Sequence, residues 1–339
     1  MAVIPTLKER WWQLFLLALA LALPHLLTSR YLFQILMMGY LFSIATLSLN
    51  LILGYTGQAS LAHAAFFGIG AYGVAILTKD GLSFWLALPA SALVAAAVGF
   101  FVGLPTLRTR GSYFAISTLC FGVIVSIVAG NWIGLTGGYT GIVGIPRPTL
   151  IRLPWLGEIS FQDRIAQYYL VLAFLLITLA VMHRLTTSLL GLSFMAVRNN
   201  ETLAGAVGID TFRVKLLSFV VGNFFAGLAG GLYASLIGSI SPSTASMELT
   251  FNWLVYLLLG GVATLSGPMI GAFVIPVIME SLQFLAEYRM LIFGALLIAV
   301  IIYFPRGAMG AVQMGRQRIS GLFSRKREVG EGVVAGQKP

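Results

Sequence analysis

The chain has 339 residues, of which 58% are hydrophobic and 9% are charged. Soluble domains carry about 25% charged residues, so this composition excludes a protein that faces water on all sides. The net charge of +10 needs no nucleic-acid partner, because basic residues gather on the cytoplasmic side of membrane proteins. We therefore expect a polytopic membrane protein.

Ten stretches of the chain are apolar enough to cross a bilayer, whose core requires roughly 20 apolar residues per helix. They predict an all-α, polytopic transmembrane helix bundle of about ten spans, and eight to eleven spans fit the pattern. In chain order the predicted spans are Trp11–Leu27, Tyr31–Leu53, Ala62–Leu77, Phe84–Leu104, Tyr113–Ala129, Tyr168–Val181, Leu216–Ile237, Phe251–Leu265, Met269–Phe284 and Leu291–Phe304.

The distribution of lysine and arginine predicts the orientation of the bundle. With the N-terminus in the cytoplasm, ten crossings leave most of the 21 basic residues on the cytoplasmic side, and the C-terminus is cytoplasmic too. We expect residues 1–308 to form the transmembrane domain, with Trp11–Leu27 retained rather than removed as a signal peptide. Residues 309–339 form a basic cytoplasmic tail that we expect to be disordered and to contact anionic membrane lipid.

A polar, glycine-rich segment, Gly54–His63, lies between two predicted spans. Irregular backbone at membrane depth must be buried in protein or line a watery cavity, and interrupted helices often hold the substrate in transporters. Gly57, Gln58, Ser60 and His63 are therefore candidate residues of a translocation path. An ordinary short loop at the membrane surface explains the segment equally well, and a hydrogen-bonded structural histidine is the alternative for His63.

A second polar segment, residues 130–167, is expected to be an extracytoplasmic loop. It contains Thr136, Gly137 and Gly138, and its glycine and proline residues predict turns and no regular element. Loops of this length in a compact protein are usually functional. We therefore expect an outer gate or a docking surface for a delivery protein, with a solvated connector as the alternative.

The third polar segment, residues 183–215, is expected in the cytoplasm. Within it Asn200 can cap a short helix that begins at Glu201, and Gly208 can end that helix. We expect the helix to have one apolar face, formed by Leu203, Ala204 and Val207. A two-turn helix is unstable alone in water, so it must pack either on the protein's own loops or on a soluble partner. Its apolar face favours the partner.

Residue patterns for catalysis and energy coupling are absent from the sequence. It contains no GxxxxGK[ST] phosphate-binding loop, no cluster of metal ligands, and no paired carboxylates or nucleophile–base set. We therefore expect a transport subunit, not an enzyme, with no cofactor. Ion-driven carriers usually bury acidic residues in their spans, and Glu280 is the clear candidate. An ion-coupled secondary transporter of a small neutral or zwitterionic solute is accordingly the alternative.

Small residues recur with helical spacing in the predicted spans. Gly222, Ala226, Gly230 and Ala234 fall on one face of a helix, and this pattern predicts close helix packing. The pentapeptide at residues 57–61 also resembles the one at residues 261–265, and internal repeats are common in transporters. Five residues can also match by chance.

Several motifs follow one another between about residue 40 and residue 308. They are Gly57–Tyr72, Leu107–Leu119, Thr136–Ile142, Ala196–Glu201 with Gly208–Ile209, Gly260–Pro268 and Phe304–Gly307. In this order they resemble the permease subunits of branched-chain amino-acid ABC transporters. The resemblance implies a multi-pass protein of the bacterial inner membrane that translocates branched-chain or similar small amino acids. Related permeases resemble carriers of urea or short amides, which is an alternative solute class.

The resemblance also implies partners. Such a permease pairs with a second, homologous permease subunit, binds two cytoplasmic ATPase subunits, and receives solute from an extracytoplasmic solute-binding protein. The segment Arg198–Gly208 would be the coupling helix that seats in an ATPase groove, through Arg198, Asn199, Asn200, Glu201, Ala204 and Gly208. Asn199 and Asn200 stand where family members often carry acidic residues. Gly57, Gln58, Ser60 and His63 would flank the translocation path together with Thr136, Gly137 and Gly138.

Overall fold

The structure is a computed structural model that describes residues 18, 20–24, 30–109, 111–149, 151–153, 157–159, 161–281 and 294. Most of the predicted first span, all but one residue of the last span, and the tail at 309–339 lie outside the described residues. The side chain of Glu280 does as well. The predictions of about ten spans and of two cytoplasmic termini therefore stay predictions.

The described chain is helical apart from two short two-stranded sheets. The elements in chain order are α2 (Arg30–Leu49), the π-helix η1 (Asn50–Tyr55), α3 (His63–Lys79), α4 (Phe84–Thr106), α5 (Ser112–Asn131), α6 (Ile133–Thr136), the 3-10 helix η2 (Gly138–Thr140), β1 (Ile142–Val143), β2 (Ile151–Leu153), β3 (Gly157–Ile159), α7 (Arg164–Thr187), α8 (Leu189–Asn199), α9 (Glu201–Ala206), α10 (Thr211–Ile237), β4 (Ser239–Ile240), the 3-10 helix η3 (Pro242–Ala245), α11 (Met247–Gly260) and α12 (Ser266–Ser281).

Five of the described helical segments are long and apolar enough to cross a membrane: Tyr31–Tyr55, Phe84–Thr106, Ser112–Asn131, Arg164–Thr187 and Thr211–Ile237. Two shorter apolar helices follow, at Met247–Gly260 and Ser266–Met279. These helices, and α3, coincide with the predicted spans between residues 31 and 284. The all-α, multi-pass prediction is thereby confirmed for the described part of the chain.

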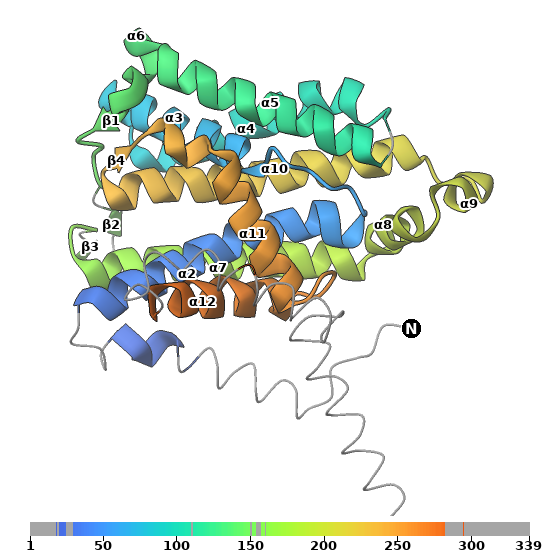
Figure 1. Cartoon of the computed structure of the whole chain (residues 1–339). Helices are drawn as coiled ribbons and strands as arrows, with labels where there is room; N and C mark the ends of the chain where they lie inside the picture. Colours follow the sequence, from blue (N-terminus) through green and yellow to red (C-terminus); the bar gives the residue numbers. More distant parts are fainter. Residues whose placement is uncertain are drawn as a thin grey trace, which may run out of the picture.

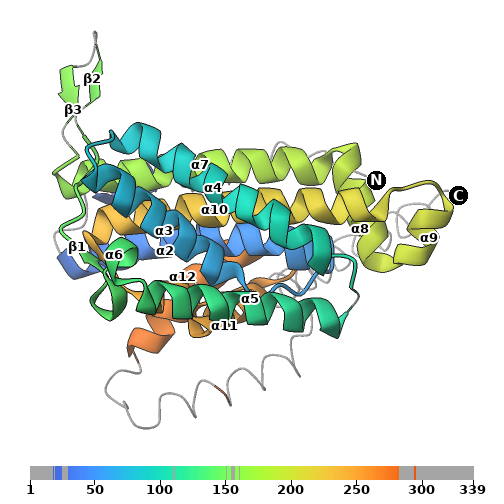
Figure 2. The same cartoon turned by 90° about the horizontal axis from the view of Figure 1, so that it is seen from above.

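The long helices lie side by side, and the connections gather at two ends of the bundle (Figure 1). At one end lie α6 and the strands β1–β4, and at the other α8 and α9 extend past the long helices (Figure 2). We call these the strand end and the α9 end. The sequence predicts that the strand end is extracytoplasmic and that the α9 end is cytoplasmic.

Helix α10 lies at the centre of the bundle, packed against α2, α3 and α4. Its small residues permit this packing, because glycine lets two helix backbones approach closely. A Cβ added at Gly230 would collide with the carbonyl of Phe67 in α3, and a Cβ added at Gly70 in α3 would collide with the carbonyl of Gly227. The predicted packing role of the small residues is confirmed.

The outer faces of α4 and α5 are apolar and exposed. Phe101 on α4 and Tyr113 and Ile124 on α5 are more than half exposed. Contiguous apolar surface of this kind is rare on soluble monomers, and it suits contact with lipid or with another membrane subunit.

The expectation that residues 130–167 contain no regular element is wrong. Strand β1 pairs antiparallel with β4, which directly follows α10, and β2 pairs with β3. Glycines supply the left-handed turns between these short elements, as Gly141 does with a φ of +71°. The prediction missed them because two- and three-residue strands leave no periodic pattern.

The predicted span Phe251–Leu265 is also corrected. Helix α11 ends at Gly260, and Gly261 adopts a φ of +127°, which a side chain would disfavour. Residues 261–265 then form an irregular connection to α12. The apolar character of Val262, Ala263 and Leu265 concealed this break.

Candidate functional site

The connection between η1 and α3, residues 56–62, is irregular, with Thr56, Ser60 and Ala62 buried and the other four residues partly or fully exposed. The Thr56 hydroxyl lies 3.0 Å from the Ser218 hydroxyl of α10, and Leu61 donates its N–H to Thr118 of α5 at 3.1 Å. Such contacts satisfy backbone and hydroxyl groups that lipid could not. The segment is therefore tied to α5 and α10 by hydrogen bonds, with Thr56 and Ser60 buried and Gly57 exposed.

The chain turns back along α2 before α3 begins. His63, the first residue of α3, is fully buried, and its Nε2 lies 2.8 Å from Ser48 Oγ and 3.0 Å from the Ala45 carbonyl. Ser48 and Ala45 precede the end of η1 by several residues, so α3 starts beside the middle of the preceding helix. His63 also packs edge-on against Trp253 of α11. Its hydrogen bonds support the structural role for this histidine.

Two buried polar atoms near this break have no hydrogen-bond partner among the described residues. They are Nδ1 of His63 and Oγ of Ser60. Buried polar atoms are usually paired with protein or with ordered water. Of the predicted path residues here, Ser60 and His63 are enclosed, whereas Gly57 is exposed and Gln58 is partly exposed.

A second interruption, at residues 261–265, is tied to the first through Asn50. The Asn50 Nδ2 donates to the Thr264 carbonyl at 2.7 Å, and its Oδ1 accepts from the Ala263 N–H at 2.9 Å. Ala263 has a φ of +58°, a left-handed conformation that costs a residue with a side chain about 1–2 kcal/mol. The two pentapeptides that resemble each other thus both form breaks between consecutive helices.

The remaining predicted path residues lie at the strand end. Thr136 is buried and donates its hydroxyl to the Ala129 carbonyl at 2.7 Å. Gly137 and Gly138 follow with φ values of +75° and +63°. Thr136 ends α6 at the strand end, whereas Gly57 lies against Arg198 of α8 at the other end of the bundle (Figure 1). The two groups of predicted residues therefore do not form one compact site.

At the α9 end, the short capped helix is confirmed. The Asn200 Oδ1 accepts the Leu203 N–H at 3.0 Å, and Gly208 follows the helix with a φ of +90°. Helix α8, which the sequence analysis did not predict, precedes α9 and packs against it.

The expected single apolar face of α9 is wrong. Ala204 is 3% exposed and packs with Phe194 and Val197 of α8 in one buried cluster. Leu203 and Val207 are 64% and 77% exposed. The three residues span about 100° around the helix axis, and only Ala204, at one edge of this arc, meets α8. The helix therefore packs on its own protein with one side and presents an apolar side to the outside.

Glu201 and Lys215 join α9 to the central helix. The Lys215 Nζ lies 2.8 Å from Glu201 Oε1, and it donates to the Leu107 carbonyl at 3.3 Å. Lys215 is only 3% exposed. Leu107 directly follows α4, so one buried ammonium group links α9, α10 and the end of α4. The sequence analysis did not identify Lys215, because nothing in the sequence places it beside Glu201.

Arg198 lies against the first interruption. A Cβ placed on Gly57, whose φ is +73°, would be 3.1 Å from the Arg198 Cγ. A predicted coupling residue and a predicted path residue are thus neighbours. Asn199, Asn200 and Gly208 are exposed at the same end.

The fold and these connections define a multi-pass membrane protein with interrupted helices and a protruding helical pair at one end. A family model described as "Branched-chain amino acid transport system / permease component" matches residues 31–301. The chain belongs to this family of transport permeases.

Curated relatives agree with the family match. The chain is 35% identical over 322 residues to the "High-affinity branched-chain amino acid transport system permease protein LivM" of Escherichia coli, covering 90% of this chain and 76% of the relative. LivM of Salmonella typhimurium matches to the same extent. LivH of Escherichia coli is 25% identical over 292 residues, covering 80% of this chain and 92% of the relative. No solved structure matches the chain.

Proposed function

We propose that the chain is one membrane-spanning permease subunit of an ATP-driven importer for branched-chain or similar small amino acids in the bacterial inner membrane. In this proposal it pairs with a homologous permease, docks two cytoplasmic ATPase subunits, and receives its solute from an extracytoplasmic binding protein. The relatives named LivM and LivH support the permease pair and the solute class.

The observation that carries the proposal is the protruding pair α8 and α9 (Figures 1 and 2). Leu189 and Leu192 of α8 are 82% and 66% exposed, and they add to the exposed Leu203 and Val207. Exposed apolar groups at a helix tip usually mark a contact surface. This surface suits a groove on a soluble ATPase.

The same segment is connected to the interior of the bundle, so that a displacement of α8 and α9 would be transmitted to α10. Ala204, Phe194 and Val197 fix the pair to the bundle through the buried cluster, and the Glu201–Lys215 ion pair ties α9 to α10. A displacement of α9 by an ATPase would therefore displace α10, against which α3 and α4 pack. Access to the interrupted segments at residues 56–62 and 261–265 would change as a result.

The test is assembly with the ATPase subunits. Leu203→Asp combined with Val207→Asp should abolish co-purification of the ATPases and ATP-dependent leucine uptake, because it adds two charges to the apolar surface. Membrane insertion should be unchanged. Leu203→Met is the matched control, since it keeps an apolar side chain of similar volume and should retain both activities. Normal assembly in the double aspartate variant would refute the proposed docking surface.

The ion-coupled alternative receives little support from the described residues. Of the acids whose side chains the structure describes, Asp80, Asp163, Asp210 and Glu248 are exposed and Glu201 is partly exposed, so none of these five is buried within a span. The side chain of Glu280, the candidate for ion coupling, lies outside the described residues. An ion-coupled carrier should accumulate solute in liposomes that contain the permeases alone and an ion gradient. Accumulation under those conditions, with no ATPase present, would favour the alternative over our proposal. Competition by urea and short amides in the same uptake assay tests the other solute class.

A further inference from the structure

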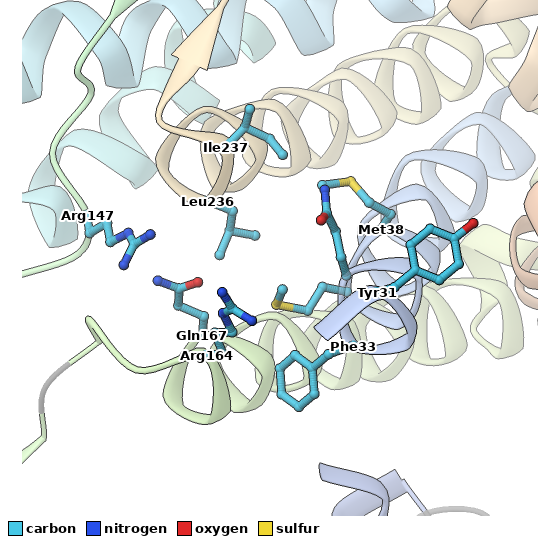
Figure 3. Close-up of a pocket in the computed structure, with 10 residues that line it drawn as sticks. Tyr31, Phe33, Met38, Arg147, Arg164, Gln167, Leu236 and Ile237 are labelled. Carbon is cyan, nitrogen blue, oxygen red and sulfur yellow. The ribbon is translucent and has the colours of Figure 1, made fainter. Parts of the chain in front are cut away.

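A cavity of about 500 Å³ lies at the strand end, among the first turns of α2 and α7 and the last turn of α10 (Figure 3). Ligand sites are typically about 300–1,000 Å³, so a small molecule fits it. Because three helices have their ends here, the cavity lies where the bundle meets the extracytoplasmic solution in the predicted orientation.

The polar side of the cavity is cationic. Arg147, from the loop after β1, and Arg164, the first residue of α7, both extend toward it (Figure 3). The Arg147 Nη1 donates to the Gln162 carbonyl at 3.1 Å, which fixes this guanidinium from behind. No carboxylate among the described residues forms an ion pair with either arginine, and none of the ten lining residues is acidic. Two guanidinium groups that have no ion-paired carboxylate among the described residues favour an anion.

The rest of the lining is mostly apolar, and its polar side chains are Tyr31, Gln34 and Gln167. Gln167 is 4% exposed and donates its Nε2 to the Phe161 carbonyl at 3.0 Å, which leaves its amide oxygen on the cavity side (Figure 3). The apolar wall is formed by Phe33, Met37, Met38, Leu236 and Ile237. Methionine side chains adapt to irregular apolar groups, so this wall tolerates side chains of different branching.

We propose that this cavity is an entry site for a small carboxylate-bearing solute with an aliphatic side chain, with Arg147 and Arg164 binding the carboxylate. The planar guanidinium group matches a carboxylate with two parallel hydrogen bonds. The apolar wall receives the aliphatic part. The assignment rests on the proposed function, because it places the solute of that importer on this chain.

The lining residues predict that the site recognises the carboxylate of the solute and not its ammonium group, unlike a site that binds both charges of a zwitterion. Arginine meets the carboxylate, but no lining carboxylate meets an ammonium group. A branched-chain 2-oxo acid should therefore bind about as well as the corresponding amino acid. An amide or amino alcohol that lacks the carboxylate should not bind.

The experiment measures equilibrium binding of radiolabelled leucine to the assembled transporter in nanodiscs. Removal of a charge-assisted hydrogen bond to the solute should weaken binding about tenfold or more, so Arg147→Gln and Arg164→Gln should each have this effect. Arg164→Lys keeps the charge without the planar fork and should fall between. Lys79→Gln is the control, because Lys79 is an exposed cation at the end of α3 outside the cavity. It should bind leucine like the wild type.

Competition against wild-type protein tests the ligand class independently of any variant. Unlabelled 4-methyl-2-oxopentanoate should displace leucine, and leucinamide should not. The assignment would be overturned if leucinamide displaced leucine as well as the oxo acid does, or if Arg147→Gln and Arg164→Gln bound leucine with unchanged affinity. It would also be overturned if phosphatidylglycerol displaced leucine and the oxo acid did not. The variant Leu203→Asp with Val207→Asp should still bind leucine, because its substitutions lie at the α9 end and not in the cavity. The entry site and the ATPase docking surface can therefore be refuted independently of each other.

Discussion

Replacing Glu201 with glutamine should destabilise the protein by about 2–3 kcal/mol. The Glu201 and Lys215 side chains are 24% and 4% exposed and approach to 2.8 Å. Loss of one partner from a buried pair leaves a buried charge and typically costs about 3–5 kcal/mol. We expect a smaller cost here because Glu201 is partly open to solvent and because the Leu107 carbonyl still accepts from Lys215.

The double variant Glu201→Gln with Lys215→Met separates stability from coupling. Removing both charges and filling the site with an apolar side chain is often neutral for stability, so most of the lost stability should return. The link between α9 and α10 is not restored, however. ATP-dependent uptake should therefore be low in both the single and the double variant, although the double variant is nearly as stable as the wild type.

Thermal unfolding of the purified transporter and leucine uptake in proteoliposomes measure the two effects. Asp210→Asn is the matched control, because the Asp210–Arg213 pair is exposed at 51% and 85% and contributes little. Asparagine also keeps the N-cap of α10, so the control should cost less than about 0.5 kcal/mol. A loss of stability in Glu201→Gln no larger than that of the control, or normal uptake in the double variant, would refute the reasoning.

Three further substitutions test the packing and the interruptions by thermal unfolding of the purified protein. Gly70→Val should destabilise by about 3 kcal/mol or more, because its branched side chain would meet the Gly227 carbonyl of α10, whereas Gly134→Ala, in open space, should have little effect. Asn50→Leu should cost about 2–4 kcal/mol, because the Ala263 N–H and the Thr264 carbonyl lose their partners; a cost below about 1 kcal/mol would show that these groups find other partners. Ala263→Gly should stabilise by about 1 kcal/mol, because glycine adopts the positive φ of this residue without strain, and a lower unfolding temperature would contradict the strain.

The helices were predictable because their signal is redundant. The bilayer requires a long apolar run, and each predicted span between residues 31 and 284 contains enough apolar residues to tolerate errors at its ends. The Asn200 cap and the Gly208 stop were predictable as well, because both depend on the local backbone alone. Helix α8 was missed because its 11 residues are too few for a span and because the sequence analysis placed them inside a polar connecting segment.

Contacts between distant segments were not predictable. Lys215 looked like one more cytoplasmic cation until the fold placed it beside Glu201 and Leu107. Arg147 and Arg164 are 17 positions apart and looked like ordinary residues of an outer loop, although they share a cavity with residues of α2 and α10. Asn50 gave no sign that it binds the backbone of residues 263 and 264. Such sites form through tertiary contacts, which a single sequence does not encode in its local pattern.

Helix α9 has one inward-facing and one outward-facing set of side chains, and burial determines which side chains belong to each set. Its one acidic side chain, Glu201, is turned inward to Lys215, and its outward groups Leu203 and Val207 are apolar. A partner that binds this surface would therefore recognise its shape and apolar groups more than its charge. The uncharged amides of Asn199 and Asn200 agree with this. The charged pair is then free to transmit movement, because a short ion pair in a buried setting resists separation more than an exposed one. Arg198 of α8 makes a second contact of this kind, because its side chain lies against Gly57 in the first interruption. In the proposed mechanism, a displacement of α8 and α9 would reach the central helix through the Glu201–Lys215 pair and the first interruption through Arg198 of α8.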